Sequence, residues 1–300
     1  MLRQDSKGRY VNVFETLTSP EILKLAYEII KSKPGNMVKG VTKETLDGIT
    51  IEWFNKTSLS LRKEHYRLKP NRRVYIPKPN GKLRPLGISS PRDKIIQQAM
   101  LMVMETVLEP KFHDTSHGFR PKRGCHTALR AVRSWRGVPW IIEGDIKSYF
   151  DSIDHNLLAD LLKRHFAEKR LFNLYWKLVK AGYIEFTGKK QTYVAADVGV
   201  PQGGIVSPLL SNLFLHELDI YMENQRLERE AASRGKLISI QNPTYKSLTY
   251  TIGKCVEARA RADLSREEGP KFGPSCTKPW TFGRKCVLSI LILSSPELDT

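Results

Sequence analysis

The spacing of apolar residues predicts several helices along the chain. Apolar positions recur every three to four residues in two segments, which is the pattern of a helix with one buried face. They are Ile22–Ile30 and Asp93–Leu108. Ser19-Pro20 is typical of a helix start, with Ser as the N-cap and Pro at the first helical position. The segments Ile51–Arg62 and Leu171–Ala181 are also expected to be helical.

Short β-type runs alternate with these helices. Val74-Tyr-Ile76 reads as a strand, and Asn80-Gly81 after it is a strong hairpin turn signal. A second hairpin is expected over Ile184–Val194, turning at Gly188, and Trp140-Ile-Ile142 is a third strand-type run. The chain is therefore predicted to be an α+β protein.

Two further helices begin at recognisable caps. Asp154 can cap a helix whose apolar residues include Leu158 and Leu162, and Ser207-Pro208 can start a long one. The loop Pro201-Gln-Gly-Gly204 precedes the second of these helices. Its glycines allow close backbone approach to a ligand, although glycine pairs are common in loops.

The net charge is the feature of the composition that says most about function. The chain has 300 residues, a formal net charge of +18 and a pI near 9.7. Three hundred residues allow one large domain or two ordinary ones. Such an excess of positive charge favours a polyanionic partner, and nucleic acid is the first candidate. No membrane role is expected, because the apolar run Val287–Leu293 is too short to span a bilayer.

Cysteine and histidine spacing does not suggest a structural metal or a disulfide framework. The four cysteines, none in a Cys-x-x-Cys pair, favour a reducing compartment. They are Cys125, Cys255, Cys276 and Cys286. His113 and His117 are four residues apart, but the Glu of a His-Glu-x-x-His motif is absent, so no metal is expected there.

Two stretches contain candidate functional residues, and each stretch has a structural and a functional interpretation. The segment from Arg67 to Arg84 is dense in Lys and Arg and contains the predicted hairpin. Its charges either protect an edge strand or grip phosphate. Asp145 follows the predicted strand Trp140–Ile142. A carboxylate there is either a turn residue or a ligand for a hard cation such as Mg²⁺.

The order of these stretches resembles a known family. Arg73–Ile88, Pro139–His155 and Gly199–Leu213 resemble the fingers and palm of a reverse transcriptase, and Ser116-His-Gly-Phe-Arg-Pro121 fits the same family. The amino-acid sequence of these blocks is similar to that of group II intron-encoded reverse transcriptase/maturases, and the resemblance runs from about Tyr10 to about Glu268. The resemblance implies an α+β fold with fingers and an incomplete palm, in which helices pack on an antiparallel palm sheet and the thumb is absent.

The same resemblance divides the chain into three parts. Residues 1–138 would form an N-terminal extension and fingers, with the first palm helix. Residues 139–222 would form the palm portion that carries Asp145 and the Pro-Gln-Gly-Gly loop. Residues 223–300 would form a basic insertion and an irregular tail.

Residue roles follow from the resemblance. Asp145 and the Ile146 carbonyl would bind Mg²⁺. Phe150 would lie under the sugar and exclude a 2′-hydroxyl. The remaining members would contact the incoming nucleotide or the template: Lys82 and Arg84 through phosphates, and Gln202 and Gly203 from the glycine-containing loop. Asp151 and Asp154 are read as structural.

One expected element is missing from the printed sequence. Reverse transcriptases take a second metal-binding carboxylate from a Tyr-x-Asp-Asp block, and this chain contains no Asp-Asp dipeptide. We therefore expect that the chain alone does not polymerise DNA. Three readings stay open: a polymerase completed by another polypeptide or by further sequence, an RNA-binding remnant that assists intron splicing, and a degenerate fragment.

Partners and location follow the family. The expected partners are group II intron RNA, primer–template nucleic acid and a deoxynucleoside triphosphate. A second polypeptide that completes the palm is a further candidate. An organelle-encoded protein is expected, in the mitochondrion, with the chloroplast as the alternative.

Overall fold

The computed structural model describes residues 2–77, 81, 83–135, 144–146, 148–188 and 190–233. The chain divides into two compact units, and the first comprises residues 1–135, 143–222 and 290–300. All the described residues except 223–233, at the end of the last helix, belong to this first unit.

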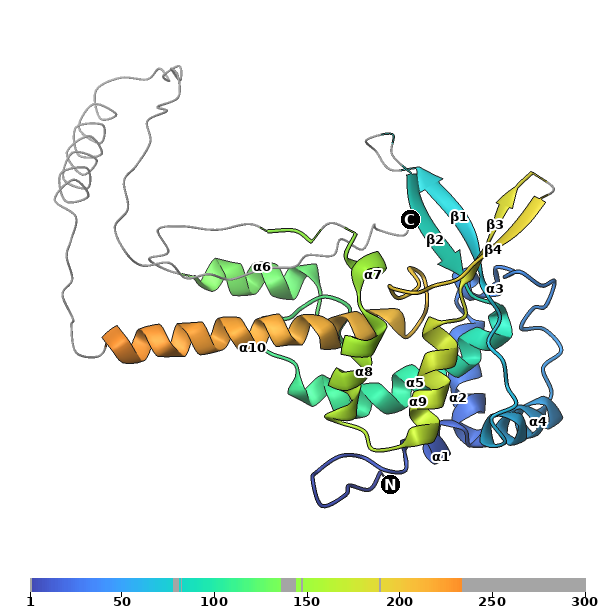
Figure 1. Ribbon diagram of the computed structural model, residues 1–300, viewed down its shortest axis with the longest axis horizontal. Helices are drawn as coiled ribbons and strands as arrows, with labels where there is room; N and C mark the ends of the chain where they lie inside the picture. Colours follow the sequence, from blue (N-terminus) through green and yellow to red (C-terminus); the bar gives the residue numbers. More distant parts are fainter. Residues whose placement is uncertain are drawn as a thin grey trace, which may run out of the picture. The chain divides into compact units, whose positions relative to one another are not determined.

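Helices make up most of the described chain (Figure 1). The N-terminal ones are α1 (Val13–Leu17), α2 (Pro20–Lys31), α3 (Pro34–Met37), α4 (Ile51–Arg62) and α5 (Pro91–Leu108), followed by the 3₁₀ turn η1 (Glu109–Lys111). The later ones are α6 (Cys125–Ser134), α7 (Tyr149–Ser152), α8 (His155–Lys163), α9 (Lys169–Val179) and α10 (Ser207–Ser233).

Two of the three predicted caps form as expected, while α10 begins at Ser207, whose hydroxyl makes no capping hydrogen bond. The Ser19 hydroxyl accepts from the Ile22 backbone N–H at the start of α2. Asp154 Oδ1 accepts from the backbone N–H groups of Asn156 and Leu157 at 2.7 and 2.9 Å and so caps α8. The bounds predicted for the helix at 51–62 are confirmed. The helix predicted over 93–108 begins two residues earlier, at Pro91, the first residue of α5.

Helix α5 is the centre of the apolar core. Most of its residues are buried, including Ile95, Ile96 and Met100, and α2 packs along it. The polar side chains of Gln97 and Gln98 are buried in the same helix. Because buried amides need hydrogen-bond partners, this helix carries more than apolar packing.

The sheet has four strands in the order β2-β1-β3-β4. They are β1 (Asn71–Pro77), β2 (Leu83–Ile88), β3 (Tyr183–Thr187) and β4 (Lys190–Val194). Both predicted hairpins are confirmed, since β1 pairs with β2 and β3 with β4 in antiparallel fashion. A short parallel pairing of Asn71 and Arg72 with Tyr183 and Ile184 joins the two hairpins, and Figure 1 shows them diverging from that junction.

The α+β class is confirmed, while parts of the finer expectation fall outside the described residues. Lys82, the predicted strand Trp140–Ile142 and residues 234–300 lie there. The described sheet does not contain Asp145, which lies in a segment without regular structure. The antiparallel palm sheet and the division into three parts stay predictions. No described helix is long and apolar enough to cross a membrane.

Candidate nucleic-acid and metal site

Asp145 lies just before a short, well-anchored turn. The side chains of Asp145 and Ile146 are exposed. Ser148 adopts a left-handed backbone conformation, with φ of 53°, and leads into α7. The Tyr149 hydroxyl donates to the Ser211 carbonyl oxygen of α10 at 2.8 Å, and burial raises the pKa of Tyr149, so this donor keeps its proton.

The turn is joined to the segment that precedes the glycine-containing loop. The Phe150 carbonyl oxygen accepts from the Val200 N–H at 2.8 Å, and the Ile153 carbonyl oxygen accepts from the Gly199 N–H at 2.8 Å. Gly199 has φ of +85°, and a Cβ there would lie 2.9 Å from the Asp151 Cα. Only glycine fits this close approach without a shift of the backbone.

The same loop also contacts strand β2. The Gly87 N–H donates to the Gln202 carbonyl oxygen at 2.7 Å. Gly203 has φ of +100°, and a Cβ there would lie 2.7 Å from the Gly87 carbonyl oxygen. The close approach that this glycine permits in the structure is therefore to strand β2.

Gln202 links the loop to the turn through its side chain. Its Nε2 donates to Asp151 Oδ2 at 3.0 Å. Gln202 thus makes one hydrogen bond to β2 through its backbone and one to the turn after Asp145 through its side chain. Asp151, read from the sequence as structural, is the residue that orients this amide.

Arg84 lies on the strand that the loop contacts. It pairs with Ile76 across the hairpin, and its side chain is exposed. Side chains two residues apart on a strand share a face. Leu86, two residues from Arg84, would contact a Cβ at Gly203, so Arg84 lies on the face of β2 that meets the loop.

The structure therefore brings some of the predicted stretches into contact and leaves others apart. The loop joins β2, which carries Arg84, to the turn that carries Phe150. Phe150 is half-buried against the core, and its ring meets Tyr149 edge-on at 5.8 Å. Asp145 is near this assembly in sequence, but the described contacts do not include its carboxylate. Lys82 lies outside the described residues.

The donor set for Mg²⁺ is partial. Within residues 2–233, as far as they are described, no three His, Cys, Asp or Glu side chains group closely enough to hold a metal ion. Asp145 offers one exposed carboxylate, and Ile146 offers a backbone carbonyl. Mg²⁺ is usually held by one or two carboxylates together with substrate phosphates, so these residues fit part of such a site.

The block around Arg120 has a structural role. Arg120 is buried and donates to the carbonyl oxygens of His113 and Ser116 at 2.7 and 2.8 Å. Its Nε donates to Glu109 Oε1 at 3.0 Å. The arginine therefore holds the loop between η1 and α6 together. Phe119, beside it, is exposed with φ of 53°.

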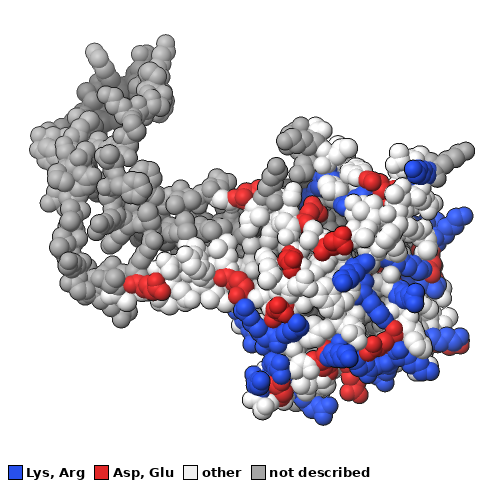
Figure 2. Space-filling model, viewed as in Figure 1, with Lys and Arg blue, Asp and Glu red and all other residues white. Residues whose placement is uncertain are grey.

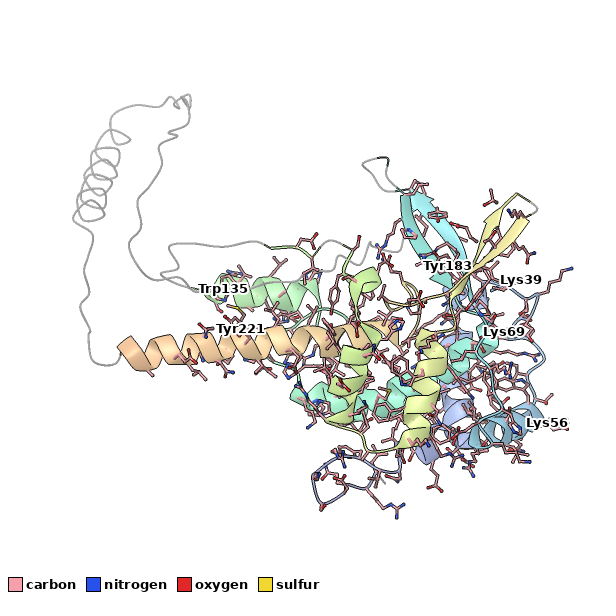
Figure 3. The ribbon with its side chains drawn as sticks, in the orientation of Figure 1. Lys39, Lys56, Lys69, Trp135, Tyr183 and Tyr221 are labelled. Carbon is pink, nitrogen blue, oxygen red and sulfur yellow. The ribbon has the colours of Figure 1, made fainter. Side chains whose placement is uncertain are left out.

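Positive charge gathers over the side of the molecule formed by the sheet and α2–α4 (Figure 2). Lys39, Lys56 and Lys69 are labelled there in Figure 3. Lys56 pairs with Glu52 at 2.6 Å, and Lys69 pairs with Glu44. The basic surface is thus interspersed with ion pairs.

Sequence reasoning missed a set of buried polar residues behind the loop. Gln97 Oε1 accepts from the Ile205 N–H at 2.8 Å, and His155 Nε2 bonds the Gly199 carbonyl oxygen at 2.5 Å. The signal available in the sequence was the pair Gln97-Gln98 inside an otherwise apolar helix. Its partners are distant in sequence, so the pattern alone does not identify them.

A comparison with family models identifies the class of protein to which this chain belongs. The family model described as reverse transcriptase (RNA-dependent DNA polymerase) matches residues 76–232. This match covers more than half of the chain, and the chain belongs to that family.

Individual relatives show which kind of reverse transcriptase the chain resembles. The "Putative COX1/OXI3 intron 1 protein" of Saccharomyces cerevisiae is 40% identical over 264 residues, covering 87% of this chain and 31% of the relative. The "Group II intron-encoded protein LtrA" of Lactococcus lactis is 40% identical over 245 residues, covering 81% and 40%. The "Uncharacterized mitochondrial protein ymf11" of Marchantia polymorpha is 36% identical over 158 residues, covering 52% and 19%.

These relatives confirm the resemblance to group II intron-encoded reverse transcriptases. The chain spans 31 to 40% of the length of the first two. What the whole relatives do is therefore carried to this chain only as a proposal.

Proposed function

We propose that this chain forms the fingers and part of the palm of a group II intron-encoded reverse transcriptase and binds primer–template RNA at the glycine-containing loop. The observation that carries the proposal is the double attachment of Gln202. Its backbone bonds Gly87 on β2 and its side chain bonds Asp151 in the turn after Asp145. A ligand at this loop would meet the basic hairpin on one side and the turn on the other.

Each site residue has a role in this proposal. Arg84 is exposed beside the loop, and its guanidinium suits phosphate, as does Lys82. Phe150 lies under the sugar, where its half-buried ring gives a rigid wall. Gln202 and Gly203 contact the nucleotide or the template base.

Members of the family use Mg²⁺, and Asp145 with the Ile146 carbonyl would hold it together with the nucleotide phosphates. The ion would neutralise charge on the reacting phosphate oxygens. Asp145 supplies one carboxylate and its exposure leaves room for a phosphate. The Asp151 carboxylate is engaged by Gln202, which supports its role in orienting that amide.

A second candidate function is RNA binding without polymerisation. It is favoured by the partial donor set for Mg²⁺ among the described residues, where Asp145 offers one exposed carboxylate. Primer extension on an RNA template with Mg²⁺ or Mn²⁺ tests whether the chain polymerises by itself. We expect no extension by the chain alone. Extension that Asp145→Ala abolishes would favour the polymerase and require a second ligand not identified above.

The proposed partners are the RNA of a group II intron and a polypeptide segment that completes the palm. The proposed location is a mitochondrion, supported by the Marchantia polymorpha relative, which is named as a mitochondrial protein. A chloroplast is the alternative. Co-purification of the chain with mitochondrial RNA tests this proposal, and recovery with chloroplast RNA alone contradicts it.

Photo-crosslinking tests the site. A primer–template RNA carries 4-thiouridine at the template base next to the primer end, and the crosslinked peptides are mapped. We expect crosslinks within residues 83–88 and 199–205. A matched RNA with the label deep in the duplex should lose them. Crosslinks confined to α4 or α9 would contradict the proposal.

A further inference from the structure

A directed chain of hydrogen bonds runs behind the glycine-containing loop. The Ile205 N–H donates to Gln97 Oε1 at 2.8 Å, and Gln97 Nε2 donates to Ser89 Oγ at 3.0 Å. Ser89 Oγ then donates to Asn71 Oδ1 at 2.7 Å. Because Ile205 can only donate here, the orientation of the Gln97 amide is fixed.

This chain connects four elements. Asn71 opens β1, Ser89 follows β2, Gln97 lies in α5, and Ile205 lies just before α10. Gln97 is 2% exposed, and Ser89 and Asn71 are also buried. A buried polar group without a partner is unfavourable, so these side chains hold one another in place.

Gln97 also limits the space available to the loop. A Cβ at Gly204 would lie 3.2 Å from Gln97 Oε1 and 2.6 Å from Ser207 Oγ. The loop is thus fixed at both ends and in the middle. Val200 bonds Phe150 at its start, Gln202 bonds Gly87 in its centre, and Ile205 bonds Gln97 at its end.

These attachments decide where the Gln202 side chain lies. A shift of the loop by a fraction of a hydrogen-bond length would move Gln202 Nε2 away from Asp151 Oδ2, its partner at 3.0 Å. Gln97 is the attachment that comes from the core helix. It is therefore the point through which the rigid part of the molecule sets the loop.

We propose that Gln97 is a positioning residue: its buried amide sets the Pro201–Gly204 loop, and through it the Gln202 side chain, for the template base and nucleotide of a bound primer–template RNA. This inference rests on the proposed function. Gln97 itself touches no ligand. Both ends of its amide are needed: Oε1 accepts from the Ile205 N–H, and Nε2 donates to Ser89 Oγ.

The test uses the 4-thiouridine primer–template RNA and the full chain. Gln97→Met keeps the side-chain volume and removes both hydrogen bonds. We expect the crosslink yield at residues 199–205 to fall about tenfold, while filter binding of the same RNA changes less than about twofold. Gln98→Met is the matched control, since Gln98 is buried in the same helix and lies outside this hydrogen-bond chain. It should keep the wild-type yield.

A second variant keeps the inference testable if Gln97→Met does not fold. In Gln97→Glu a protonated carboxyl can accept from Ile205 and donate to Ser89, whereas the carboxylate can only accept. The crosslink yield relative to wild type should be low at about pH 8 and recover at about pH 5.5, since burial favours the neutral acid. Ser89→Ala, which removes one link, should give an intermediate loss.

The outcomes distinguish failure of the proposed function from failure of the positioning role of Gln97. A wild-type chain that gives no crosslink at residues 199–205 would overturn the proposed function itself. Wild-type crosslinking that persists undiminished in Gln97→Met would overturn only the positioning role. So would a Gln97→Glu yield that does not change with pH relative to wild type. A yield that falls equally in Gln98→Met would show general loosening of α5 and also overturn it.

Discussion

The Gly87 N–H donates to the Gln202 carbonyl oxygen at 2.7 Å, and this bond joins strand β2 to the glycine-containing loop. Gly87 and Gln202 are far apart in sequence but lie in two of the stretches that resemble the reverse transcriptase family. The neighbouring Gly203 makes the contact possible, because a side chain there would collide with the Gly87 carbonyl.

Gly203→Ala should loosen this junction. The backbone has φ of +100°, and the added Cβ would lie 2.7 Å from the Gly87 carbonyl oxygen. We expect a loss of about 2–3 kcal/mol in the free energy of unfolding, from strain and the displaced strand. Urea unfolding measures it. Gly48→Ala is the control, because Gly48 has φ of +67° with no atom within 4 Å of the added Cβ. Equal losses of unfolding free energy in the two variants would contradict a steric collision between the added Cβ and the Gly87 carbonyl oxygen.

Arg120→Met should destabilise the chain strongly. Arg120 is buried and bonds two backbone carbonyls and Glu109, so its removal leaves these acceptors without a donor. We expect a loss of about 3–5 kcal/mol in the free energy of unfolding. Arg123→Ala serves as the control, because its partner Asp114 is almost fully exposed. A loss in Arg120→Met no larger than in Arg123→Ala would show that the buried network contributes little.

The imidazole of His165 should make stability depend on pH. Burial, with Lys111 and His216 nearby, lowers the pKa of His165 to about 4. Between about pH 6.5 and pH 4 the unfolded chain therefore binds a proton that the folded chain does not, and acid favours unfolding.

A variant isolates this effect from the other titrating groups. His165→Gln removes the titration and keeps a polar side chain. The difference in unfolding free energy between wild type and variant should shift by roughly 1 kcal/mol against the wild type from pH 7 to pH 4.5, after allowance for solvent screening. A difference that stays constant over this range would contradict the lowered pKa.

Local signals predicted much of the fold. Ser19 and Asp154 are side chains that satisfy backbone N–H groups at helix starts, so their roles depend on nearby residues only. Gly188 has φ of +62° and turns the second hairpin where the sequence indicates. Caps and turns of this kind can be predicted because a few neighbouring residues determine their geometry.

The rest depends on contacts between distant residues. The parallel pairing of Asn71 with Tyr183 joins two hairpins, and nothing in either hairpin specifies the other. Arg120 lies in the stretch Ser116–Pro121, which fits the family by sequence, and only its burial shows that it has a structural role. Gln97 acquires its role only when Ser89 and Ile205 are brought to either side of it.

The most direct test of RNA binding through the basic hairpin is a salt series with the full chain. Filter binding of a primer–template RNA is measured for wild type, Arg84→Ala and Lys56→Ala. Lys56 is a matched control, since it is exposed on α4 and paired with Glu52. If Arg84 contacts phosphate, the logarithm of the affinity falls linearly with the logarithm of the salt concentration, and Arg84→Ala flattens the slope by roughly 0.7–0.9 while Lys56→Ala leaves it nearly unchanged. Affinity that does not depend on salt, or equal slopes for Arg84→Ala and wild type, would contradict RNA binding through the basic hairpin.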